Sequence, residues 1–114
     1  MAFNEIVAMR ARDALQARGA KASEKRMMGG MIFLINGNML MGLKTLKTGQ
    51  EQFMFRVGKD HEDEALAIPG TRPMVHGGRR MLGFLFINED ACPAETFTSL
   101  MSMAHDYVSS LQSK

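Results

Sequence analysis

The chain has 114 residues, enough for one domain around a single hydrophobic core and too few for a Rossmann domain with a separate substrate domain. Hydrophobic residues make up 46% and charged residues 23%, which is the composition of a folded protein. The net charge of +2 is too small to indicate nucleic-acid binding by itself. Twelve methionines, with one tyrosine and no tryptophan, are the unusual feature. We expect one domain, residues 1–114.

The cellular compartment is predicted from the cysteine count and the N-terminal residues. A single cysteine, Cys92, excludes an intrachain disulfide and fits a reducing compartment. The first residues lack the charged and then apolar order of a signal peptide. The longest apolar run, residues 31–35, is far too short to span a bilayer. These features predict a cytoplasmic protein without membrane contact.

The first predicted element is a helix that Asn4 caps and Gly19 ends. Its apolar residues recur at three- and four-residue spacing, so one face is predicted to be buried. Residues 20–25 are polar and predict a loop. Residues 26–28 are a candidate for a short strand before a turn at Gly29-Gly30.

The next predicted unit is a β-hairpin. Residues 31–35 are apolar throughout and precede Asn36-Gly37, the best natural pair for a type I′ turn. Residues 31–35 and 38–43 are therefore predicted to be antiparallel strands. Residues 45–51 predict a second turn. Residues 52–57 follow as a strand with Phe53 and Phe55 on one face and Met54 on the other.

The second half begins with a short helix that Asp60 is predicted to cap and Pro69-Gly70 to end. Residues 71–80 predict an ordered but irregular connection to a buried strand at 81–87. The last helix is predicted to have Pro93 at its first position and has the clearest amphipathic spacing in the chain. The predicted fold is α+β, a two-layer sandwich with helices on an antiparallel sheet of about five strands, in the order α-β-β-β-α-β-β-α.

No catalytic or metal-binding constellation emerges, so we expect no enzyme, no metal and no cofactor. His61, His76 and His105 fall in three elements, and none has a second ligand at a metal-binding interval. Cys92 near a helix N-terminus is a candidate reactive thiol, but an incidental position is favoured because there is no resolving cysteine. Acids at 60–64 are interpreted as first-turn helix residues and not as an acid–base pair.

Arg72, Arg79 and Arg80 form the most distinctive polar cluster. Their guanidinium groups could hold a phosphate or carboxylate of a small molecule. The alternative, which we favour, is that they pin their loop to the acidic helix at 60–64. Charge is also uneven along the chain, with a net of +6 over residues 1–59 and −4 over residues 60–114. Nucleic-acid binding through the basic half is therefore a further alternative, although its phenylalanines are mostly expected in the core.

Five blocks of sequence stand in order between residues 25 and 84. They are K-R-M-M-G-G at 25–30, N-G-N-M with a later Gly42, R-V-G at 56–58, E-A-L with P-G and R-P-M at 64–74, and G-R, M and G-F at 78–84. In this order they resemble the N-terminal domain of the TfoX/Sxy family, bacterial regulators linked to natural competence. The matching residues interpreted as structural are Met27, Gly29, Gly30, Asn36, Gly37, Gly58, Pro69, Gly70, Pro73, Met74, Gly78, Met81 and Gly83. The candidates for binding an anion or a partner are Arg56, Arg72, Arg79 and Arg80.

The resemblance implies a two-layer domain similar to type III secretion chaperones. It also implies a non-enzymatic role in transcriptional control through protein contacts, alongside the cyclic-AMP receptor protein, and it supplies no catalytic residue. Met28, Val75 and Arg80 depart from the family's usual Phe, Asp and Pro. The second, C-terminal domain of the competence regulators is expected to be absent. A homodimer through a sheet edge or an apolar helix face is a further alternative.

The methionines are interpreted mainly as adaptable core filling. The position of each methionine on the sheet tests this interpretation. Methionines on the face beneath the helices are core residues. Methionines that point outward from an uncovered sheet face would instead mark an interface.

Overall fold

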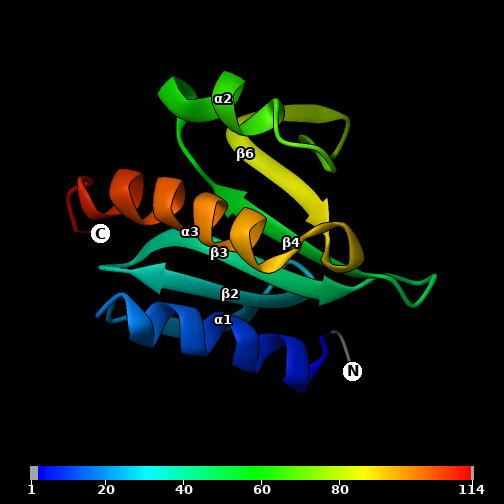
Figure 1. Cartoon of the computed structure of the whole chain (residues 1–114), viewed down its shortest axis with the longest axis horizontal. Coiled ribbons are helices and arrows are strands. Elements are labelled where there is room, and N and C mark those ends of the chain that lie inside the picture. Colours follow the sequence, from blue (N-terminus) through cyan, green and yellow to red (C-terminus); the bar gives the residue numbers. More distant parts are fainter. Residues whose placement is uncertain (1–2, 114) are drawn as a thin grey trace.

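The computed structural model describes residues 3–113, and it confirms the predicted two-layer α+β fold (Figure 1). One layer is a six-stranded antiparallel sheet in the order β1-β2-β3-β4-β6-β5. The elements are α1 (Glu5–Ala17), β1 (Ser23–Met27), β2 (Gly30–Ile35), β3 (Asn38–Thr45), β4 (Glu51–Arg56), the 3-10 turn η1 (Lys59–His61), α2 (Glu62–Leu66), β5 (Thr71–His76), β6 (Arg79–Asn88), the 3-10 turn η2 (Glu89–Ala91) and α3 (Ala94–Ser109).

Both long helices begin and end close to where the sequence predicts. The Oδ1 atom of Asn4 accepts the N–H groups of Ile6, at 2.8 Å, and Val7, so Asn4 is the N-cap of α1. Gly19 follows the helix with a φ of 69°, the left-handed conformation that glycine adopts without strain. Helix α3 begins at Ala94, and Pro93 is its N-cap and not its first helical residue.

The first two hairpins use the same turn chemistry. Asn36 and Gly37 both have positive φ, 53° and 82°, as a type I′ turn requires, which confirms that hairpin. Between β1 and β2 the two such residues are Met28 and Gly29, so the predicted Gly29-Gly30 turn is wrong by one residue. Gly30 already belongs to β2, where a Cβ atom would overlap the carbonyl oxygen of Leu43.

Three other predictions need correction. Residues 23–25, expected in a loop, begin the edge strand β1, which is exposed on most of its length and therefore carries no apolar pattern. Residues 71–80 form the turn region of a fourth hairpin, β5–β6, and not an irregular connection, because Gly77 and Gly78 form a positive-φ turn and an edge strand tolerates Pro73. Asp60 lies within η1, and α2 starts two residues later without a side-chain cap.

The main core lies between the sheet and the helices α1 and α3. Phe53 and Phe55 of β4 are fully buried there. Their ring centroids lie 5.1 and 5.6 Å from the centroid of Phe97 on α3, in edge-on geometry. The predicted alternation along β4 is confirmed, because Met54 belongs to a separate cluster on the opposite face of the sheet.

Arg10 joins α1 to the segment that leads into α3. Its Nη1 and Nη2 atoms donate to Glu89 Oε2, at 3.2 Å, and to the carbonyl oxygen of Cys92, at 2.8 Å. Its guanidinium carbon lies 4.5 Å from the ring centroid of Phe97. This one side chain therefore fixes the position of α1 against the start of α3.

Glu62 fixes α2 to β6. Its carboxylate is largely buried and accepts the backbone N–H of Gly83 at 2.6 Å and Nη2 of Arg80 at 3.0 Å. Gly83 has a φ of 83°, and its carbonyl oxygen accepts the N–H groups of Val57 and Gly58. The carboxylate therefore stabilises β6 at Gly83, where the regular alternation of its side chains between the two faces of the sheet is interrupted.

Replacing Glu62 with alanine should leave the Gly83 N–H and the Arg80 guanidinium without their partner. We expect a loss of about 1–3 kcal/mol in the free energy of unfolding, measured by urea denaturation. Glu64→Ala is the matched control, because the Glu64 side chain is 68% exposed and pairs only with His61. Equal stability of the two variants would contradict the assigned role.

Candidate functional site

One face of the sheet is not covered by any helix that the structure describes. Antiparallel partners point to the same side, so the strand register defines this face, which we call the open face. One row of partners on it crosses all six strands and consists of Lys25, Ile32, Gly42, Met54, Phe86 and Arg72. The apolar cluster of the open face contains strand residues only.

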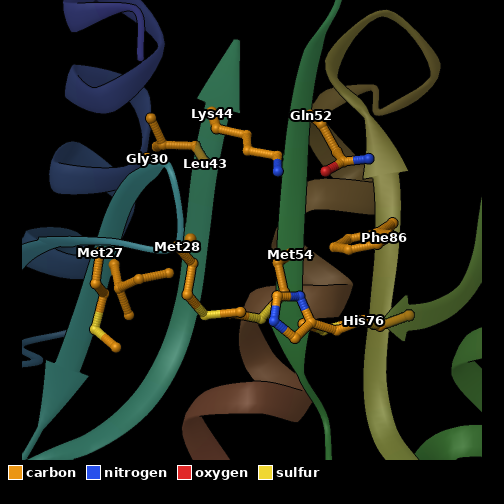
Figure 2. Close-up of a pocket in the computed structure, with 12 residues that line it drawn as sticks. Met27, Met28, Gly30, Leu43, Lys44, Gln52, Met54, His76 and Phe86 are labelled. Atoms are coloured by element: carbon orange, nitrogen blue, oxygen red, sulfur yellow. The ribbon is translucent and has the colours of Figure 1, made fainter. Parts of the chain in front are cut away.

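The open face is curved into a groove. Met28, at the turn beside one edge strand, and His76, at the end of the other, line the same pocket as Met54 on a central strand, and Figure 2 shows both side chains directed toward Met54. Edge strands of a flat six-stranded sheet would lie roughly 24 Å apart. The two edges therefore bend toward each other over the centre.

The pocket in this groove is small and apolar. Its volume is about 60 Å³, whereas sites for drug-sized ligands usually have about 300–1,000 Å³. The apolar side chains around it come mainly from methionines, with Ile32 and Phe86. Gly42 lines it without a side chain, because a Cβ atom there would overlap the Ile32 side chain and come within 3.1 Å of the Met31 carbonyl oxygen. The pocket can accept one apolar side chain.

The methionines divide between the two faces. Met31, Met41 and Met101 belong to the core beneath the helices, as core filling predicts. Those of the open-face cluster are Met27, Met39, Met54, Met74 and Met81. The second group lies on the uncovered face of the sheet, which is the position that the sequence analysis associated with an interface. Met28, with 36% of its surface exposed, extends this group over the pocket.

Every charged side chain that the register places on the open face is basic. They are Lys25, Lys44, Arg56, Arg72 and Arg79, with the titratable His76 beside them. The structure describes all twelve acidic residues of the chain. Ten lie in helices and 3-10 turns, and the register places Glu24 and Glu51 in the strands on the helix-covered face.

The predicted arginine cluster is divided by the structure. Arg80 binds Glu62 of α2, which is the contact that the pinning interpretation predicts. Arg72 instead lies over the ring of Phe86, 5.6 Å from its centroid, and Arg79 is exposed at the hairpin opposite His76. Arg56 lies 5.3 Å from the ring centroid of Phe84 and 5.6 Å from that of Tyr107 on α3, so it is at the margin of the open face, and it donates to the carbonyl oxygen of Met39.

The sequence did not indicate Lys25, Lys44 or His76 as part of this site. Lys25 falls in the segment predicted to be a loop, and only the six-stranded register places it in line with Ile32 and Arg72. Lys44 lines the pocket, and Figure 2 shows it on the strand beside that of Gln52. No alternation in the sequence pointed to it, because a register shift in this part of the sheet places both Leu40 and Met41 in the helix-side core.

Among residues 3–113, the open face has no aromatic ring that is free for stacking on nucleic-acid bases. The phenylalanines of the basic N-terminal half, Phe3, Phe33, Phe53 and Phe55, are all buried on the helix side. On the open face, the rings of Phe84 and Phe86 have the guanidinium groups of Arg56 and Arg72 beside them. This arrangement does not favour a stacking platform for single strands.

Other candidate sites receive no support from the geometry. Cys92 is buried, and burial raises the pKa of its thiol to about 11, while Arg10 lowers it and Glu89 raises it further. Burial and the raised pKa therefore support the incidental position that the sequence analysis favoured over a reactive thiol. Among residues 3–113, no group of three His, Cys, Asp or Glu side chains is placed to hold a metal ion. Within the same residues, no helix has the length and apolar character needed to cross a membrane.

A scan against protein-family models finds no model that matches the chain. Searches of curated proteins and of solved structures find no significant match. The resemblance to the TfoX/Sxy N-terminal domain therefore stays a prediction from the sequence blocks.

The thiol of Cys92 should be unreactive in the folded protein. At pH 8 it is almost entirely protonated, because its pKa is about 11, and burial blocks access to the sulfur atom. We expect labelling by a disulfide reagent to be slow in buffer and fast in denaturant. Rapid labelling of the folded protein would contradict this assignment.

Proposed function

We propose that this protein is a non-enzymatic interaction domain that acts in transcriptional control and binds its protein partner through the open face. The observation that carries the proposal is the methionine-lined pocket at the centre of a sheet face that none of the described helices covers. Methionine side chains adapt to different apolar shapes, which suits a surface that binds another protein.

The size and chemistry of the pocket favour a protein partner. A pocket of about 60 Å³ holds one side chain, and the apolar surface around it extends over several strands. The sheet edges are poor alternatives for strand addition, because β1 presents Lys25 and Arg26 and β5 contains Pro73. The open face therefore suits a protein partner better than either sheet edge does.

The regulatory part of the proposal comes from the sequence blocks. Five of them stand in the order of the TfoX/Sxy N-terminal domain, whose members regulate competence. The glycines of those blocks act in the fold: Gly29 and Gly78 form hairpin turns, and Gly83 forms the irregular point of β6. We therefore propose that the protein regulates transcription by contacting another protein.

The test is complementation of a deletion strain, with transcript levels as the measurement. Met54→Lys and Met28→Lys introduce a charge into the groove, the first at its buried centre and the second at an exposed turn that tolerates substitution. Both should fail to restore the wild-type transcript profile while thermal unfolding shows that the Met28 variant stays folded. Met9→Lys, an exposed methionine of α1, should restore it.

Two results would contradict the proposed function. The first is an unchanged transcript profile after deletion. The second is full complementation by both groove variants, which would show that the open face is not used.

A further inference from the structure

We propose that the segment bound by the open face is acidic: it inserts an apolar side chain into the methionine-lined pocket and sets carboxylates against the surrounding lysine and arginine side chains. This inference rests on the proposed function and names the chemistry of the partner. Its support is the charge arrangement around the pocket.

Basic groups flank the pocket along and beside the row that crosses the sheet. Lys25 ends this row at one edge strand, and Arg72 ends it at the other. Lys44 lines the pocket itself. An extended or helical segment seated over Met54 would therefore meet a cation on more than one side.

These cations lack acidic partners among residues 3–113. None of Lys25, Lys44, Arg56, Arg72 and Arg79 forms an ion pair with a described carboxylate. Away from this face, Arg10, Arg12, Arg18 and Arg80 each pair with an acid, whereas Lys21, Arg26, Lys47 and Lys59 form no ion pair with a described carboxylate. What distinguishes the open face is that no acid lies on it. The open face thus has a positive field that a negatively charged segment would complement.

A second copy of the chain does not fit this surface. A two-fold dimer through the open face would bring its basic groups against one another, and like charges at an interface cost binding free energy. All twelve acids lie off this face. A homodimer through the open face is therefore not favoured, and the sheet-edge or helix-face homodimer predicted from the sequence stays a separate alternative.

The phosphates of a nucleic acid could pair with the basic side chains of the open face, but a nucleic acid has no apolar side chain for the pocket at its centre. Its phosphates would have to lie against Met54 and Met74, which are buried and offer no hydrogen bond, and the phenylalanine rings already have arginine neighbours. An acidic protein segment satisfies both features, since its apolar side chain fills the pocket and its carboxylates pair with the arginines.

The test uses a display library of short random peptides as the probe. Peptides are selected on the folded wild-type protein and counter-selected on Met28→Asn, which removes the apolar side chain without adding a charge and suits the positive φ of this residue, so that groove-dependent binders are kept. We expect the enriched peptides to be rich in Asp and Glu around at least one large apolar residue. Binding of a synthetic version should weaken as salt is raised.

Charge reversal then tests the pairing directly. The double variant Lys44→Glu/Arg72→Glu should bind the synthetic peptide at least about tenfold more weakly. It should regain binding to the same peptide with its glutamates changed to lysines. Lys21→Glu/Lys47→Glu is the matched control: it makes the same change in net charge at exposed loop positions off the row, and it should bind the acidic peptide with an affinity close to that of the wild type.

The outcomes separate the two proposals. Enrichment of neutral or basic peptides that still require the groove would overturn the acidic partner and leave the interaction domain standing. Failure to select any groove-dependent peptide would overturn both. Tight binding of a deoxythymidine oligonucleotide that the Lys44→Glu/Arg72→Glu variant loses would replace both with nucleic-acid binding.

Discussion

Alternation along β4 divides this molecule in two. Phe53 and Phe55 point to the helices and meet Phe97, while Met54 between them points to the opposite face. Within residues 3–113, α1 and α3 cover only one face of the six-stranded sheet. The other face is shielded by its own long side chains and by its curvature, and this is how Met54 is only 5% exposed without a helix above it.

The same division separates the charges. Acids lie in helices, 3-10 turns and the helix-covered side of the strands, where several of them hold elements together, as Glu62 and Glu89 do. The open face has basic groups from both halves of the chain, Lys25 and Lys44 from the first and Arg72 from the second. The small net charge of +2 therefore conceals a division between a basic open face and the rest of the molecule, in addition to the uneven charge of the two sequence halves.

Strong local signals in the sequence predicted much of the fold. Asn36-Gly37 defined a hairpin, the Phe and Met alternation defined β4, and the apolar spacing of the last helix defined α3. The two edge strands were harder to predict. Strand β1 is polar because most of its residues are exposed, and β5 contains a proline that only an edge position permits.

The candidate site was only partly predictable, because it depends on which face each strand residue occupies. Arg72 and Arg80 are close in sequence, yet one lies on the open face and the other binds α2. The irregular point at Gly83 separates Arg80 from the regular alternation of residues 84–88. The methionine count pointed to the right residues, but the register of six strands was needed to divide them into core and surface.

The most direct test of this account uses the methionines themselves as reporters. Methyl groups labelled with carbon-13 are followed by NMR while the selected acidic peptide is added. The account predicts shifts for Met27, Met28, Met54 and Met74, with Met31, Met41 and Met101 unchanged beneath the helices. Shifts concentrated on the helix-side methionines, or on the exposed Met9 of α1, would contradict it.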